Sequence, residues 1–533
     1  MRTSDKEKLC TVRCSEIFYY LFWVIMLFAK GTGLYEGMRQ YNICLVLAML
    51  CLGISLILTG FRVVELIWMS ALVLFGGWIY LHSGDQSAFI LVAVMIGLKN
   101  KRLSRVFKIG AAVWGLCFVY MVLRTLIGAG DPGPMLAHEK LGLGPILRWS
   151  LGYTHPNVLQ ITYVILSCFI LYIWNLKPGR GQWGITCWLM LGNLYIFLYS
   201  VSFTGFLFMT FLLVLNLYLQ GRGRFTKIEE AGLQAVFPVC VLFSLAGPLL
   251  LDKETKLFDL INRALNSRFL ATRVYLEEFG ISLWGRRMSV LKGFAVDCSY
   301  TEALLSYGAV FFVLIVLGYM LTIHDMVKKK RHKELAIVLS LLVAGISEPF
   351  LFNASFKNIT VLFVGEYLFL QSDRIAERIP ALGGKIPFLS CLDKELYIPA
   401  GPAESLSAVL RKTLKKYRRS AACVAAVSLA VCAMFGWRFS RQPDSIYVGL
   451  HATNCADQEE KYLDAENLPE GFNSEIYEYV SPRDPMYEFD GNMLKVEHVR
   501  KTVSAGVWGG AGAAAAYLVV LALRNRKKMT VSG

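Results

Sequence analysis

Long apolar stretches, separated by short polar connections, recur along most of the chain. A helix needs roughly 20 apolar residues to cross the hydrocarbon core of a bilayer. The pattern therefore predicts an all-α polytopic membrane protein of about fourteen spans. The predicted spans lie at about 17–35, 42–60, 63–81, 86–98, 106–126, 157–175, 182–200, 204–220, 233–251, 302–322, 335–352, 358–371, 420–438 and 503–523. The fourth is short, which favours a tilted or partly re-entrant segment.

The charges between the spans predict the orientation. With the N-terminus inside, the basic connections all fall on the cytoplasmic side, as the positive-inside rule requires. These connections are KNKRLSR at 99–105, KPGRG at 177–181, GRGR at 221–224, KKKRHK at 328–333, KKYRR at 415–419 and RNRKK at 524–528. Both termini are then cytoplasmic, and the long outward connections are 127–156, 252–301 and 441–500.

The composition agrees with a membrane protein and excludes other classes. Hydrophobic residues make up 55% of the chain and charged residues 18%, a balance that a soluble protein does not need. The net charge of +16 arises from short basic runs between spans, so no nucleic-acid partner is expected. Only two of the 13 cysteines, Cys298 and Cys455, are expected to face outward, and no Cys/His spacing fits zinc. We expect no disulfide framework, metal or other cofactor.

The first long outward connection ends in RWSLGYTHPNVL at 148–159. Pro156 suits the first turn of the sixth span, with Thr154 or His155 near its N-cap. One interpretation is that His155 and Asn157 only complete this helix start. The other is that Arg148, His155 and Asn157 project into a cavity at the membrane surface, where the helix N-terminus favours a phosphate.

The second long outward connection is unusually polar. If 260–278 is one helix, Asn262, Asn266 and Arg273 share a face, whereas Arg268 lies about 140° from Arg273. Both arginines can then reach one ligand only if the helix breaks between them. The alternative is that these arginines contact lipid headgroups.

Carboxylates near the outer surface are candidates for acid–base chemistry. Asp297 and Ser299 precede the tenth span, where Asp297 is either an N-cap or a general base. Glu348, before Pro349, and Glu366 lie within predicted spans, where ionisable groups are costly and suggest function. Each glutamate either pairs with an inner arginine or takes a direct part.

Three motifs occur in a fixed order on the outward connections: R-x-S-L-G-Y-x-H-P-N, then N-S-R-F with G-I-x-L-x-G, then V-D-x-S-Y-x-x-x-L-x-x-Y-G. In this order they resemble the bacterial O-antigen polymerase and O-antigen ligase family. The variety with HPN and VDNSY is nearest to the Wzy-type capsular and exopolysaccharide polymerases of Gram-positive bacteria. The resemblance covers roughly residues 10–372.

The resemblance implies a metal-independent glycosyltransferase of the GT-C type that acts on saccharides carried by undecaprenyl diphosphate, on the outer face of the plasma membrane. Two positions depart from the family: Phe203 replaces the arginine of an S-R-T-G turn, and Cys298 replaces the asparagine of VDNSY. In the ligase branch, a catalytic histidine lies near the position of Asp297. The predicted catalytic residues are Asp297, His155, Arg268 and Arg148, and the predicted substrate-binding residues are Asn157, Asn266, Arg273, Ser299, Tyr300 and Glu348.

We therefore expect a polymerase of lipid-linked oligosaccharides in a bacterial plasma membrane, whose partners are this substrate, membrane lipid and a chain-length regulator or other polysaccharide assembly proteins. The alternatives are an O-antigen-type ligase, a polysaccharide flippase, and an inactive assembly scaffold. The predicted organisation is a twelve-span domain at 1–372, a cytoplasmic linker at 373–419, and a two-span unit at 420–533 that holds the outward module 441–500. Gly506 and Gly510, at GxxxG spacing, predict close packing of the last two spans.

Overall fold

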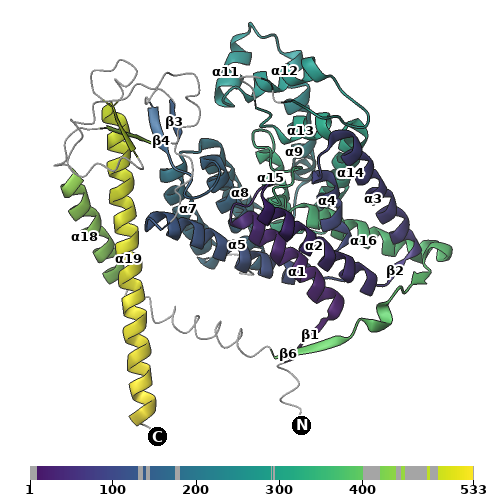
Figure 1. The fold of residues 1–533 in the computed structure, drawn as a ribbon, viewed down its shortest axis with the longest axis horizontal. Coiled ribbons are helices and arrows are strands. Elements are labelled where there is room, and N and C mark those ends of the chain that lie inside the picture. Colours follow the sequence, from purple (N-terminus) through teal and green to yellow (C-terminus); the bar gives the residue numbers. More distant parts are fainter. Residues whose placement is uncertain are drawn as a thin grey trace.

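The computed structural model describes residues 9–129, 136–139, 145–174, 180–289, 291, 295–399, 421–439, 446–449, 477–480 and 490–531. It is mostly helical, and eight helices of the described part are long and apolar enough to cross a membrane (Figure 1). These eight are α1 (Cys14–Gly31), α2 (Arg39–Leu58), α3 (Val63–Ser83), α5 (Leu103–Leu126), α6 (Pro156–Ile173), α8 (Phe203–Gly221), α9 (Lys227–Leu245) and α14 (Ala309–Lys328). The chain is thus a helical membrane protein, as predicted.

The remaining elements are further helices, which include a C-terminal pair, and four antiparallel strand pairs, two of which join segments far apart in the sequence. The helices are α4 (Ser87–Ile96), α7 (Arg180–Ser200), α10 (Gly247–Leu250), α11 (Lys256–Ala264), α12 (Arg268–Phe279), α13 (Ser299–Tyr307), α15 (His332–Ala344), α16 (Val361–Arg378), η2 (Pro380–Leu382), η3 (Ser390–Leu392), α18 (Ala421–Phe439) and α19 (Asp490–Val531). The antiparallel strand pairs are β1 (Leu9–Arg13) with β6 (Glu395–Pro399), β2 (Phe61–Arg62) with β5 (Lys385–Ile386), β3 (Leu136–Glu139) with β4 (Pro145–Arg148), and β7 (Ile446–Gly449) with β8 (Tyr477–Val480).

Burial separates the helices of the bundle interior from those at its surface. In α6, 72% of the apolar window is buried, whereas the share is 22% in α2, whose exposed side chains include Leu50 and Ile57. Large exposed apolar faces are what a bilayer covers. The short fourth stretch forms α4, only ten residues long and mostly buried, so it lies within the bundle and not along its lipid-facing surface.

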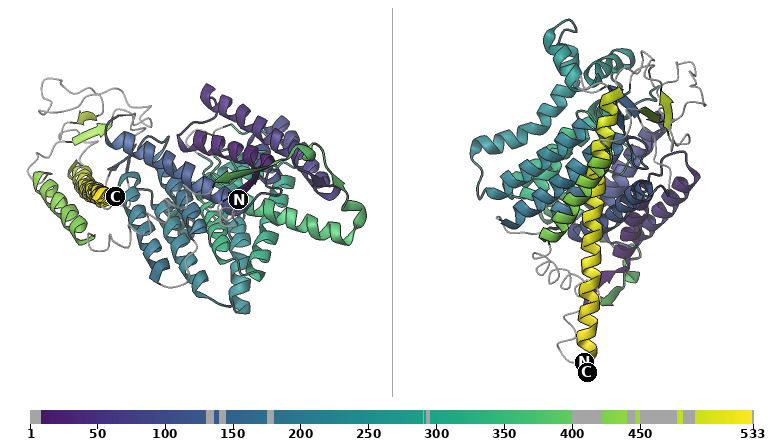
Figure 2. Two further views of the ribbon diagram at one scale, coloured as in Figure 1. Left: turned by 90° about the horizontal axis from the view of Figure 1, so that it is seen from below. Right: turned by 90° about the vertical axis from the view of Figure 1, so that its left-hand side faces the viewer.

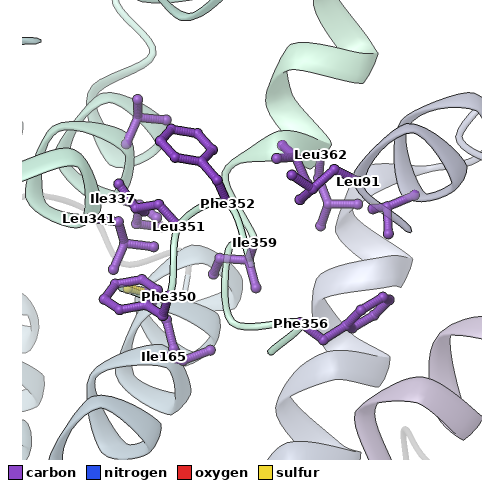
Figure 3. Close-up of a cluster of buried hydrophobic side chains, with 14 of the residues drawn as sticks. Leu91, Ile165, Ile337, Leu341, Phe350, Leu351, Phe352, Phe356, Ile359 and Leu362 are labelled. Atoms are coloured by element: carbon purple, nitrogen blue, oxygen red, sulfur yellow. The ribbon is translucent and has the colours of Figure 1, made fainter. Parts of the chain in front are cut away.

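The segment between α15 and α16 is irregular although it is buried. The sequence pattern predicts a span through 352, but α15 ends at Ala344, and the chain turns repeatedly until α16 begins. Phe350, Leu351 and Phe352 pack into the core (Figure 3). Irregular backbone at membrane depth is tolerated only where the protein supplies hydrogen bonds, and here Asn358 Nδ2 donates to the Leu351 carbonyl at 2.5 Å.

The two ends of the bundle differ. Helices α11 and α12 lie at one end, and the β1–β6 pair lies at the opposite end, in both side views (Figures 1 and 2). The sequence-predicted outward connection 252–301 is therefore separated from the sequence-predicted cytoplasmic face by the length of the bundle.

The C-terminal helices α18 and α19 form a closely packed pair beside the bundle (Figure 1). A β-carbon on Gly506 would lie 2.0 Å from Cys432 Sγ, and one on Gly510 would lie 3.1 Å from Ser428 Cβ. The prediction of close packing at these glycines is confirmed. The pair also contacts the bundle, because the buried Arg500 donates through Nε to the Leu198 carbonyl of α7 at 2.6 Å.

Two glycines hold the outward connection against the start of α14. Gly285 and Gly308 both have positive φ, at 83° and 87°. A β-carbon on Gly308 would lie 2.3 Å from the Gly285 nitrogen and 2.4 Å from the Leu283 carbonyl oxygen. The close approach lets the Ala309 amide donate to the Ser282 carbonyl at 2.9 Å.

We expect Gly308→Ala to destabilise the protein strongly, because backbone atoms meet the new methyl group and positive φ alone costs about 1–3 kcal/mol. The measurement is the apparent unfolding temperature of purified protein in detergent. Gly318→Ala is the matched control, since its nearest neighbour is a side-chain atom at 3.4 Å. Equal unfolding temperatures for the two variants would contradict the close approach.

Candidate functional site

An ion cluster forms near the starts of α6, α8, α12 and α13. Arg268 Nη2, at the start of α12, lies 3.1 Å from Asp297 Oδ2 and 3.7 Å from Glu348 Oε1. The side chains of Arg268 and Glu348 are 8% and 6% exposed, whereas that of Asp297 is 37% exposed. The cluster therefore has a buried half and a half that solvent or a ligand can reach.

A backbone break places Arg268 in the cluster. The sequence predicts one helix over 260–278, but the chain forms α11 and α12, because Asn266 and Ser267 take the left-handed conformation at φ 53° and 65°. The break precedes Arg268, which becomes the first residue of α12. The side chain of Asn262 stabilises the break, since its Oδ1 accepts from the Leu270 amide at 2.9 Å.

Arg268 and Arg273 lie on the same helix and point to different places. Arg273 Nε binds Glu277 Oε1 at 2.6 Å, and its Nη1 donates to the carbonyls of Pro248 and Leu251 at 3.3 and 2.9 Å. Arg273 thus ties α12 to the end of α10. Of the predicted residues on this loop, the cluster contains Arg268, while Arg273 and Asn266 lie outside it.

Arg148 joins the cluster through Asn157. Its Nη2 donates to Asn157 Oδ1 at 2.6 Å, and Asn157 Nδ2 donates to Glu348 Oε1 at 3.5 Å. Arg148 Nε donates to the Ser200 carbonyl at the end of α7, at 2.8 Å. Burial lowers the pKa of Arg148 to about 10, while the Glu348 carboxylate opposes that shift, so this buried guanidinium keeps its charge at neutral pH.

His155 and Pro156 begin α6 as the sequence predicts. His155 is the N-cap, its Nδ1 accepts from the Asn157 amide at 3.1 Å, and Pro156 occupies the first helical position. This cap fixes where Asn157 projects. His155 therefore caps α6, as one interpretation predicts. Asn157 in addition contacts Arg148 and Glu348.

Ser299 and Tyr300 hold the irregular segment that carries Glu348. Ser299 Oγ donates to the Glu348 carbonyl at 2.5 Å and accepts from the Leu351 amide at 3.1 Å. The Tyr300 hydroxyl donates to the Leu342 carbonyl of α15. Both residues are fully buried, so they support the cluster from behind.

Asp297 is not the N-cap of α13. The N-cap residue is the buried Cys298, which makes no side-chain capping hydrogen bond. The capping interpretation of Asp297 is therefore wrong: its carboxylate instead pairs with Arg268. Cys298, which the sequence places on the outer side of the membrane, is buried within the protein, and Cys455 lies outside the described residues. The predicted side of the membrane stays a prediction.

Two residues of the cluster were missed from the sequence. Thr204 Oγ1 donates to Glu348 Oε1 at 3.0 Å, although its turn sequence looked ordinary. Lys357 lies near Glu348, and burial lowers the pKa of its ammonium group to about 8, while the Glu348 carboxylate opposes the shift. The sequence did contain a signal that could have identified Lys357, namely a cationic residue between two predicted spans, next to Asn358.

Phe203, which departs from the turn sequence of the resembled family, packs on Phe197 with 5.1 Å between the ring centres.

Glu366, the other glutamate of the predicted spans, lies away from this cluster. Its Oε2 binds Arg331 Nη2 at 2.6 Å, at the start of α15. Glu366 thus pairs with an arginine that the sequence places on the cytoplasmic side, whereas Glu348 contacts Arg268, which the sequence places on the outer side.

Two polar atoms at the site lack partners. Arg268 Nε and Ser202 Oγ are shielded from solvent and make no hydrogen bond within the described part of the chain. Buried donors are usually satisfied, so the unpartnered Arg268 Nε is an exception that suits a functional position. A guanidinium that keeps a donor beside a neighbouring cation can bind an anion with more than one oxygen.

Glu348 is buried and Asp297 is partly exposed, so substitutions at these two positions should change the stability by different amounts. We expect Glu348→Gln to lower the free energy of unfolding by about 3–5 kcal/mol, because it removes the buried charge between Arg268 and Lys357. Asp297→Asn should cost no more than about 1 kcal/mol, because that side chain is partly exposed. The measurement is the apparent unfolding temperature, with the exposed Glu278→Gln as the control. A larger loss for Asp297→Asn than for Glu348→Gln would contradict the assignment of the buried anchor.

No family model, curated protein or solved structure matches this chain. The family resemblance therefore rests on the three sequence motifs, and membership stays a prediction.

Proposed function

We propose that the protein is a glycosyltransferase that joins oligosaccharide repeat units carried on undecaprenyl diphosphate, at the outer face of a bacterial plasma membrane. The observation that carries this proposal is the charged cluster built from all three outward motifs. Arg148, Arg268 and Asp297 come from separate motifs and converge around Glu348. Packing alone does not require three charged residues from separate loops to meet in this way.

The cluster suits a lipid-diphosphate leaving group. Departure of the diphosphate places negative charge on its oxygens, which permanently charged, planar guanidinium groups stabilise with paired hydrogen bonds. Arg268 lies beside both carboxylates of the cluster, while Arg148 adds positive charge nearby. The apolar faces of the surrounding helices offer the polyprenyl chain a surface within the bilayer.

Asp297 is the candidate general base, because it is the most exposed carboxylate of the cluster. In the proposed step, a hydroxyl oxygen of the acceptor sugar attacks the anomeric carbon of the donor sugar. The bond between that carbon and the diphosphate oxygen breaks, its electron pair leaves with the lipid diphosphate, and the hydroxyl proton passes to Asp297. The products are a longer glycan and undecaprenyl diphosphate.

We expect Arg268→Lys to reduce chain growth about 10²–10³-fold, because lysine keeps the charge but loses the planar pair of donors. The measurement is the rate at which purified protein in proteoliposomes lengthens a lipid-linked oligosaccharide. Arg273→Lys is the control on the same helix and should retain most activity. Normal chain growth in Arg268→Lys, at equal protein level, would remove the diphosphate role.

Asp297→Asn should lower the rate about 10²-fold or more, because an amide cannot accept the acceptor's proton. The pH–rate profile is measured alongside the rate, and the limb that reports the base should disappear in the variant. An unchanged profile with full polymer output would assign Asp297 a structural role, and His155 would become the leading candidate for the base.

A further inference from the structure

A cavity lies beside the charged cluster, in the part of the chain that the sequence predicts to face outward. Its volume is about 340 Å³, at the lower end of the range of about 300–1,000 Å³ for small-molecule sites. Its walls come from the end of α3, from α12, α13 and from the outward connection. The lining residues used below are Asp85, Tyr275, Arg286, Ser289, Val296 and Glu302.

Glu302 is the unusual residue of this cavity. Its Oε2 is shielded from solvent and has no hydrogen-bond partner among the described residues. The charged groups that act on it are themselves carboxylates, namely Asp85, Asp297 and Glu36. Burial, together with these neighbouring carboxylates, raises the pKa of Glu302 well above its ordinary value. A polar side chain with an unpartnered oxygen in a cavity wall can exchange hydrogen bonds with a ligand there.

Asp85 is a second acceptor, and its orientation is fixed. Its Oδ1 accepts from the amide and hydroxyl of Ser87 at 2.8 and 2.5 Å, and its Oδ2 accepts from the Tyr307 hydroxyl at 3.3 Å. The ring of Tyr275 adds an apolar wall, and Arg286 adds a donor. Two acceptors, a donor and an aromatic face suit a ligand that carries several hydroxyl groups, and the arginine disfavours a simple cation.

The cavity and the charged cluster meet at Asp297. Val296, its neighbour in the chain, lines the cavity, whereas the Asp297 carboxylate pairs with Arg268 of the cluster. The cluster is rich in guanidinium groups, and the cavity is rich in carboxylates. The side of Asp297 that faces the guanidinium groups therefore suits an anionic group. The side that faces the cavity suits hydroxyl groups.

We propose that this cavity binds the acceptor sugar, with Glu302 and Asp85 accepting hydrogen bonds from its hydroxyl groups. The inference rests on the proposed function and extends it to the second substrate. Glu302 then contributes to acceptor binding, and Arg268 to departure of the leaving group. The two residues should affect different kinetic constants.

The experiment measures chain growth by full-length protein in proteoliposomes while the acceptor concentration is varied. The acceptor probe is the repeat oligosaccharide released by mild acid from the producing cells' lipid diphosphate, so it has neither lipid nor phosphate. Glu302→Gln should raise the acceptor KM about fivefold and leave kcat within about twofold, since one hydrogen bond to an acceptor hydroxyl group is weakened. The exposed Glu278→Gln on α12 is the matched control.

The unfolding temperature separates this role from a structural one. Because burial and the neighbouring carboxylates raise the pKa of Glu302, ionisation of this side chain does not stabilise the folded state, and Glu302→Gln should leave the unfolding temperature equal to or above that of the unchanged protein. A lower unfolding temperature with an unchanged acceptor KM would overturn the inference and make Glu302 structural. If the unchanged protein extends no glycan at all, the proposed function fails; if it extends glycan and Glu302→Gln has a normal KM, only the acceptor site fails.

Discussion

A carboxylate buried within the protein needs partners, and Glu348 obtains them from several segments. Because α15 ends at Ala344, Glu348 lies on irregular backbone that Ser299 holds by two hydrogen bonds. Its side chain then accepts from Thr204 and Asn157 and lies near Arg268 and Lys357. Satisfying one buried charge thus brings the starts of α6, α8, α12 and α13 together, and the exposed Asp297 is held at the edge of the same cluster.

The apolar pattern was sufficient for the helical class and for most of the long helices, because membrane spans are determined by the length and hydropathy of local sequence. Local pattern could not predict where α15 ends, since Gly345 and Pro349 interrupt a stretch whose hydropathy continues. The left-handed pair Asn266 and Ser267 likewise breaks a regular helical pattern. The break after Ala344 is stabilised by the distant Ser299, whereas the break at Asn266 is stabilised by the nearby Asn262. Both breaks determine the site.

The sequence pattern identified some of the charged residues of the site and missed others. Arg148, Arg268 and Asp297 stand out because packing does not explain charges at these positions between predicted spans, and the structure brings them together around Glu348. Asn266, Arg273 and Tyr300 were chosen from the same segments, yet Arg273 binds carbonyls and Tyr300 binds α15. Glu302 and Asp85 were missed, since a single carboxylate near a helix start is ordinary until a cavity surrounds it.

The C-terminal helix pair contacts the same end of α7 that supports Arg148. Arg500 binds the Leu198 carbonyl, and the Tyr199 hydroxyl donates to Ser504 Oγ at 2.6 Å. The Trp149 amide donates to the Tyr199 carbonyl at 2.8 Å, and Arg148 binds the next carbonyl. The part of the chain outside the family resemblance therefore packs directly behind one arginine of the proposed site.

We propose that this protein itself lengthens glycans on a lipid diphosphate. Reconstitution of the purified protein tests this activity directly. Purified protein in proteoliposomes receives a single lipid-linked repeat unit, and the products are separated by size. We expect a ladder of lipid-linked glycans that differ by one repeat unit, with one undecaprenyl diphosphate released per joining step. Unchanged substrate, or transfer of a single unit to a different acceptor with no ladder, would contradict it.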